Sequence, residues 1–106
     1  MSQYRQIFVD TAGNLFSFAY NRKPSNNVTI SGNQATAGTT ARSGRLTSLH
    51  VDDAGHLYQR YQGRWVSVGT SHAFTGHIVY PVHVQESDGK VYKKVKGQYL
   101  PLTVVA

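Results

Sequence analysis

The chain has 106 residues, no cysteine and a net charge of +6. This length allows one domain with a single modest core, and the lack of cysteine excludes a disulfide framework and any thiolate-based zinc site or nucleophile. No apolar run approaches the roughly 20 residues that span a bilayer, and the first six residues lack the layout of a signal peptide. We therefore expect a cytoplasmic protein without a membrane partner.

Short runs of β-branched and aromatic residues dominate the chain, and clusters of Gly, Asn, Asp and Ser separate them. No window has the i, i+3, i+4, i+7 spacing of an amphipathic helix. The pattern predicts an all-β protein. Its strands are expected near residues 5–10, 14–20, 27–31, 46–52, 56–61, 64–69, 77–85, 90–95 and 98–104.

The predicted strands form three copies of one strand–turn–strand–turn–strand unit. In the second copy, four residues separate residues 55–58 (GHLY) from Gly63, and in the third copy four residues separate residues 89–92 (GKVY) from Gly97. A degraded copy, IFVDTAGNLF, opens the chain. We expect one domain over residues 1–106, built from three antiparallel three-stranded meander repeats. Repeats 1, 2 and 3 cover about 4–31, 46–69 and 77–104, and a loop or short irregular strand occupies 32–45.

Each predicted repeat has two glycine-containing turns. Residues 11–13 (TAG) and 53–55 (DAG) are typical of tight hairpin loops whose glycine has a positive φ. Residues 87–89 (SDG) fill the same place with one extra residue, and residues 62–63 and 96–97 form the second turns. The acidic residues gather at the first turns, whereas the basic residues follow them, so each repeat has an acidic end and a basic remainder.

Because side chains alternate across a strand, each repeat can be sorted into two faces. One face is aliphatic in every copy, and we expect it to form the core. Its members are Ile7, Val9 and Leu15 in repeat 1, Leu49, Val51, Leu57, Val66 and Val68 in repeat 2, and Val82, Val84, Val91, Leu100 and Leu102 in repeat 3.

The opposite face repeats the order histidine, aromatic, base, aromatic. It carries His50, Tyr58, Arg60 and Trp65 in repeat 2, His83, Tyr92, Lys94 and Tyr99 in repeat 3, and Phe8, Phe16, Phe18 and Tyr20 in repeat 1. One interpretation is packing: the rings are buried and the basic stems lie over them. The other is a binding surface that stacks bases or sugars and holds a phosphate or acidic group. We expect the eight residues of repeats 2 and 3 to be ligand-binding.

The sequence offers little support for enzyme or metal chemistry. It has no phosphate-cradling loop and no G-x-S-x-G motif. His50 and Asp52 are spaced to share an ion, but no third ligand joins them, so we expect no metal and no cofactor. A metal-independent ribonuclease would use His50, His83, Arg60 and Lys94. Two equivalent copies of these groups argue against a single active site, and we predict that the protein is not an enzyme.

The pattern of glycines and aromatics in residues 49–69 and 82–102 resembles the meander blades of short-repeat propeller lectins. The resemblance implies propeller-like blades, and three blades are too few to close a ring, so a homo-oligomer is expected. A small barrel or a trefoil-like arrangement of three repeats is the alternative.

The net charge favours an anionic partner through long-range attraction. We predict a small binding protein that engages nucleic acid or a nucleotide, or an acidic surface of a host protein that it blocks. One alternative is a lectin-like module whose aromatics bind a carbohydrate. Another is a structural or assembly protein whose aromatic face is an oligomer interface.

Overall fold

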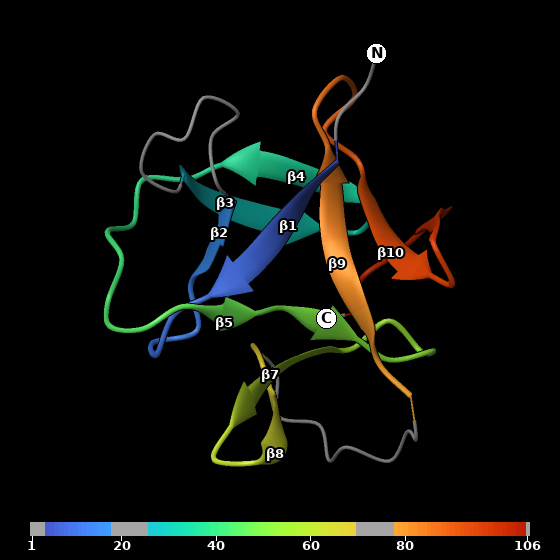
Figure 1. Cartoon of the computed structure of the whole chain (residues 1–106). Coiled ribbons are helices and arrows are strands. Elements are labelled where there is room, and N and C mark those ends of the chain that lie inside the picture. The colour runs from blue at the N-terminus through green and yellow to red at the C-terminus, as the bar shows by residue number, and fades with distance from the viewer. Residues whose placement is uncertain (1–3, 18–25, 70–77, 106) are drawn as a thin grey trace.

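The computed structural model describes residues 4–17, 26–69 and 78–105, and in these ranges the chain forms eleven strands and no helix (Figure 1). The strands are β1 Tyr4–Val9, β2 Leu15–Ser17, β3 Asn26–Ser31, β4 Gln34–Ala37, β5 Thr47–Ser48, β6 His50–Val51, β7 Leu57–Tyr61, β8 Arg64–Ser67, β9 Tyr80–Gln85, β10 Val91–Val95 and β11 Gln98–Pro101. The all-β prediction is confirmed. Within the same ranges no helix is long and apolar enough to cross a membrane.

All the strands join into one antiparallel sheet, in which β1 and β9 lie at the centre (Figure 1). The main path runs β4-β3-β2-β1-β9-β6-β7-β8, β10 and β11 extend from β9, and β5 pairs with β1. The strand predicted over 46–52 is interrupted at Leu49, which separates β5 from β6. Predicted strand residues 18–20 and 77, with Phe18 and Tyr20, lie outside the described residues.

The predicted turns have the expected backbone. Gly13, Gly55 and Gly89 all have positive φ, at 90°, 94° and 70°. In the second turns, Gln62 and Lys96 also have positive φ, at 50° and 49°, and a positive-φ glycine follows each of them. Two left-handed central residues define the type I′ turn, whose twist matches that of the flanking strands. These turns therefore fix the register of the β7–β8 and β10–β11 hairpins.

Asp10 and Asp52 organise the turns that follow β1 and β6 in the same way. Each Oδ1 accepts backbone N–H hydrogen bonds from the second and fourth residues after it, at 2.8 to 3.0 Å. Both side chains are buried. Burial alone would raise the pKa of either carboxyl group, but these and further hydrogen bonds outweigh it and lower the pKa of both. The two carboxylates are therefore structural anions that hold the turns.

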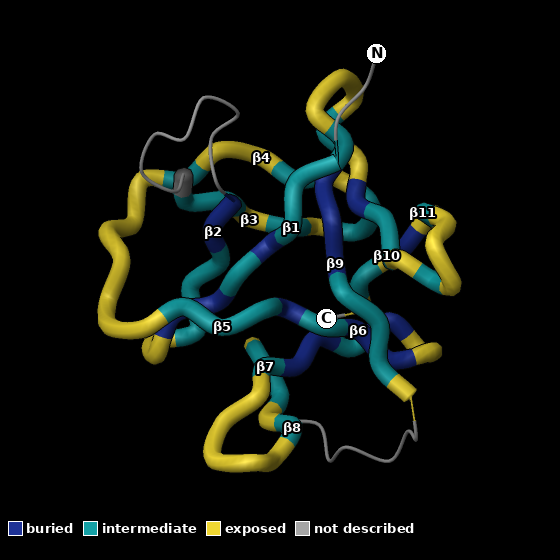
Figure 2. Tube along the Cα trace, viewed as in Figure 1, coloured by how far each residue is buried: buried dark blue, intermediate teal, exposed yellow. Residues whose placement is uncertain are grey.

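The core is aliphatic, and most of the predicted members belong to it (Figure 2). Its buried residues are Ile7, Val9, Leu49, Val51, Leu57, Val82, Val84, Val91 and Leu102, and Leu15 and Val68 pack against them. The prediction is wrong for Val66 and Leu100, which are each 38% exposed. They lie on β8 and β11, which each pair with only one strand at the edge of the sheet, so alternation along these strands does not direct their side chains into the core.

Residues 34–37, within the segment 32–45 for which a loop or a short irregular strand is predicted, form strand β4. This strand pairs with β3 and also reaches repeat 3, because Ala35 N donates to Gly89 O at 2.8 Å. The later part of the segment, residues 38–45, contains no strand and is mostly exposed. Only this latter part behaves as a loop.

Candidate binding site on two hairpins

The register of the hairpins places the predicted site residues opposite one another. Arg60 pairs with Trp65 across β7 and β8, and Lys94 pairs with Tyr99 across β10 and β11. His50 lies opposite Tyr58, and His83 lies opposite Tyr92. Directly opposite residues have Cβ atoms about 4.5–5.5 Å apart, so the side chains of Arg60 and Lys94 each lie within reach of an aromatic ring. The matching order in the sequence thus corresponds to matching cross-strand pairs.

The first group, here called the Trp65 cluster, consists of His50, Arg60 and Trp65. The guanidinium carbon of Arg60 lies 4.9 Å from the centre of the Trp65 ring, within the range of a cation–π interaction. The His50 ring lies at the same centroid distance from Trp65 and is inclined by 57°. Trp65 and His50 are half-buried, and Arg60 is exposed. The cluster therefore offers an anion or a flat ring both a charge and an aromatic surface.

The second group, here called the Tyr99 cluster, consists of Tyr4, His83, Tyr92, Lys94 and Tyr99. Tyr99 stacks on Tyr4 with parallel planes and centroids 3.8 Å apart, and the edge of His83 approaches it at 5.1 Å. Lys94 Nζ lies 5.5 Å from the centre of the Tyr99 ring. Tyr92 contacts Tyr4 edge-on at 5.3 Å. Rings and one exposed cation again form a single contact group.

Tyr4 is a member of the site that the sequence did not indicate. It belongs to β1, far along the chain from Tyr99, and it reaches the cluster because β1 pairs with β9. The repeat pattern compares positions within a unit and carries no information about which strands of different units lie side by side. A long-range pairing prediction would have been needed to find Tyr4.

Tyr58 does not belong to an accessible surface, although we predicted it to bind ligand. Its side chain is 1% exposed, and its hydroxyl donates to Asp52 Oδ2 at 3.0 Å. The equivalent Tyr92 is half-buried, and its hydroxyl donates to the exposed Asp88 at 3.1 Å. Tyr58 thus joins the core to the first turn of repeat 2, whereas Tyr92 remains partly open.

Both histidines of the site have a lowered pKa. For His50 burial is the main cause and nearby Arg60 adds to it, whereas the Ser48 carbonyl, 3.2 Å from Nδ1, acts in the opposite direction. For His83 burial is again the main cause, followed by Lys94, and the Pro81 carbonyl opposes them without forming a well-aligned hydrogen bond to Nδ1. The lowered pKa disfavours protonation of both imidazoles, so Arg60 and Lys94 supply the positive charge of the clusters.

Lys93 forms another cation–ring pair that the sequence reasoning missed. Its Nζ lies 5.3 Å from the centre of the Tyr80 ring. Lys93 alternates with Lys94 along β10, so it serves the face opposite to the Tyr99 cluster. The sequence shows two adjacent lysines, but no residue close to Lys93 in the sequence indicates that its ammonium group lies near the Tyr80 ring.

Seven of the eight predicted residues therefore form two groups, one beside the β7–β8 hairpin and one beside the β10–β11 hairpin, and Tyr58 belongs to neither. Figure 2 shows β8, which carries Trp65, and β11, which carries Tyr99, at different edges of the molecule. In the described parts of the chain, no group of three or more His, Asp or Glu side chains could hold a metal ion. Comparison of the chain with protein-family models, curated proteins and solved structures finds no significant match.

Proposed function

We propose that this chain is a non-enzymatic binding protein that engages single-stranded nucleic acid through the Trp65 and Tyr99 clusters. The observation that carries the proposal is the Arg60–Trp65 pair, in which an exposed guanidinium lies 4.9 Å from a half-buried indole. Stacking of a base on an aromatic ring, next to a cation that meets the phosphate, is the usual basis of sequence-tolerant binding of single strands.

Three features support a polyanion over a small neutral ligand. The chain carries a net charge of +6, which attracts a phosphate backbone at long range. A second ring–cation pair, Lys94 and Tyr99, repeats the first on another hairpin, and a polymer can engage both at once. Exposed Arg64, Lys90 and Lys96 lie on or beside the same hairpins and add to the positive potential.

We also propose that the three repeats surround a pseudo-threefold axis and close into a small barrel. Support comes from the strands that begin the repeats, which are β1 in repeat 1, β5 and β6 in repeat 2, and β9 in repeat 3. The pairs β1–β5, β6–β9 and β9–β1 join these strands in a closed cycle. Equivalent pairs also face each other in every repeat, namely Phe8 with Phe16, His50 with Tyr58, and His83 with Tyr92. In such a closed arrangement each chain completes its own ring, so binding does not require an oligomer.

The test is fluorescence anisotropy with a short labelled oligothymidine at low and moderate salt. We expect affinity to fall steeply with salt, as it does when phosphate contacts release counterions. Replacing Trp65→Ala should cost about 1–3 kcal/mol of binding free energy, the value of one base stack. Circular dichroism of the variant establishes that it is folded.

The matched control separates a site from a general charge effect. Arg60→Gln and Arg42→Gln each remove one positive charge, but Arg42 lies in the exposed segment 38–45, which belongs to neither hairpin. We expect a clearly larger loss for Arg60→Gln. Equal losses, or affinity that ignores salt, would refute the site. Quenching of Trp65 fluorescence by simple sugars, without oligonucleotide binding, would instead favour a carbohydrate-binding module.

A further inference from the structure

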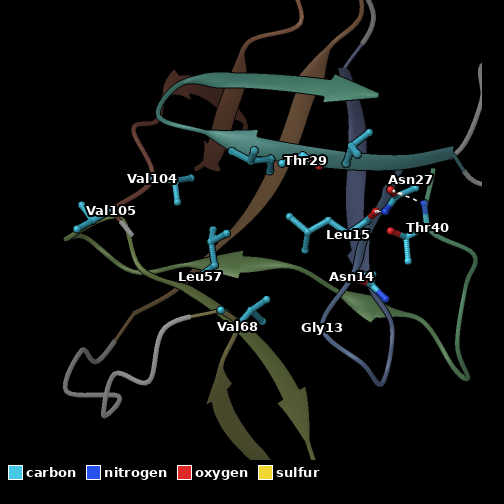
Figure 3. Close-up of a pocket in the computed structure, with 13 residues that line it drawn as sticks. Gly13, Asn14, Leu15, Asn27, Thr29, Thr40, Leu57, Val68, Val104 and Val105 are labelled. Carbon is cyan, nitrogen blue, oxygen red and sulfur yellow. Dashed lines mark hydrogen bonds between the residues drawn. The ribbon is translucent and has the colours of Figure 1, made fainter. Parts of the chain in front are cut away.

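A cavity of about 340 Å³ lies away from the two aromatic clusters, between strands β2 and β3 on one side and the ends of repeats 2 and 3 on the other (Figure 3). Leu15 and Val28 contribute from β2 and β3, Leu57 and Val68 from repeat 2, and Val104 from repeat 3. The cavity is thus built where all three repeats meet. Ligand sites in proteins commonly have this size.

The cavity has an apolar end and a polar end, as Figure 3 shows. Leu57, Val68 and Val104 form the apolar end, and Leu15 lies between the two ends. The side chains of Asn14 and Thr40 lie at the polar end with that of Asn27. A ligand that fills such a space should therefore have an apolar part and a polar part.

Hydrogen bonds hold the polar end in place. Asn27 Nδ2 donates to Leu15 O at 2.9 Å, and Asn27 Oδ1 accepts from Thr40 N at 3.0 Å. The Asn27 amide therefore links β2, β3 and the segment after β4. These bonds use one N–H and one lone pair of the Asn27 amide and fix the position of Thr40, whose hydroxyl can meet a ligand.

The uncharged lining disfavours the binding of ions. None of the described residues that line the cavity carries a charged side chain, although the chain as a whole has a net charge of +6. Moving an ionised group from water into an apolar space without a partner is costly. The cavity is therefore matched to a neutral molecule, unlike the two clusters that carry Arg60 and Lys94.

We propose that this cavity is a second binding site, for a small uncharged molecule with an apolar body and one hydroxyl group. An apolar cavity of about 150 Å³ accommodates benzene, so a volume of about 340 Å³ suits a bicyclic body. The rings lie against Leu57, Val68 and Val104, and the hydroxyl group meets Thr40. The site is independent of nucleic-acid binding.

The experiment uses 2-naphthol as the probe and follows the amide resonances of the full-length chain by NMR. We expect saturable binding at one site. The largest changes in amide chemical shift should occur at Gly13, Thr40 and Gly69, which line the cavity. Naphthalene-2-sulfonate has the same rings and a negative charge, and we expect it to bind more weakly at these amides. Tighter binding of the sulfonate there would show that charge drives the association and would overturn the proposal.

Two substitutions locate the probe. Val68→Trp fills the apolar end and should weaken 2-naphthol binding by about tenfold or more, whereas Val66→Trp, on the exposed side chain two residues earlier, should change it by less than about twofold. If Val68→Trp does not fold, Val104→Trp replaces it. Thr40→Val should weaken 2-naphthol but leave naphthalene unaffected. Equal effects of Val68→Trp and Val66→Trp, or no saturable binding by the unmodified protein, would overturn the proposal.

Discussion

Tyr58 donates a hydrogen bond of 3.0 Å to Asp52, and both side chains are buried. Asp52 uses its other carboxylate oxygen to accept the N–H groups of Ala54 and His56. One buried pair therefore connects strand β7 to the turn that precedes it. Burial, followed by the bond to Asp52 and its charge, raises the pKa of Tyr58, so the phenol remains a donor throughout the physiological range.

Tyr58→Phe removes this donor and leaves a buried carboxylate with one partner fewer. We expect the free energy of unfolding to fall by about 1.5–3 kcal/mol, the range for hydrogen bonds to charged groups. Urea denaturation measures it. Tyr92→Phe is the matched control, because its partner Asp88 is exposed and water can replace the hydroxyl. A loss for Tyr92→Phe as large as that for Tyr58→Phe would contradict the structural role of the buried pair.

The lowered pKa values of His50 and His83 predict that stability falls in mild acid. Because the folded pKa of each lies below the unfolded value near 6.5, the unfolded chain binds protons first. The stability contribution is full above about pH 6.5 and decreases as the pH falls from there through the folded values. NMR titration of the imidazoles gives the folded pKa values directly.

The control for this pH effect is the double substitution of both histidines by Phe. We expect the doubly substituted chain to lose much of the decline in urea stability between about pH 7 and pH 5. A folded pKa above 6.5 for either histidine would reverse the sign and contradict the prediction. An unchanged decline in the variant would assign it to other groups.

Gly55 occupies a crowded left-handed position. Its φ is 94°, a Cβ there would lie 2.4 Å from the carbonyl oxygen of Thr103, and its own carbonyl accepts the N–H of Val105 at 2.9 Å. Gly55→Ala should therefore strain the turn and also displace segment 102–105. Gly63 also has a positive φ, at 76°, but a Cβ there meets nothing within 4 Å.

Comparing the two glycines separates strain from contact. Gly63→Ala should cost about 1–2 kcal/mol of unfolding free energy, the price of a left-handed Ala. Gly55→Ala should cost about 1–3 kcal/mol more, because packed backbone must move. Thermal or urea unfolding of both variants measures the difference. Equal losses would show that segment 102–105 does not rest on the turn as described.

The parallel stack of Tyr4 on Tyr99, with centroids 3.8 Å apart, joins the first strand of the chain to its last hairpin. A double-mutant cycle with Tyr4→Ala and Tyr99→Ala should give a coupling energy of about 0.5–1.5 kcal/mol. The same cycle with Tyr4 and Tyr61, which is exposed on β7, should give additive effects. Coupling in the second cycle would point to a global change and not to the stack.

The turns and the cross-strand pairs were predictable because they depend on local chemistry. Glycine in a short turn favours a left-handed backbone, and a fixed turn length then sets which residues face each other, as for Arg60 with Trp65. The aliphatic core of the central strands followed from simple alternation. Each of these features is determined by residues that lie close to it in the sequence.

The parts that could not be predicted depend on contacts between distant segments. Tyr4 reaches Tyr99 only through pairing of β1 with β9. Strand β4, over Gln34–Ala37, contains two alanines and little β-branched content, and its backbone pairs with β3 and with Gly89. Tyr58 is buried and its hydroxyl donates to buried Asp52, a pairing that alternation alone does not reveal.

The left-handed backbone of Gln62 and Lys96 has a practical consequence for protein engineering. Asn and Gly are favoured at the first central position of a type I′ turn. Gln62→Asn and Lys96→Asn would therefore reduce the conformational cost of the positive φ without changing any aromatic residue of the two clusters. A scaffold stabilised in this way would tolerate designed changes to its binding preference, since most such changes reduce stability.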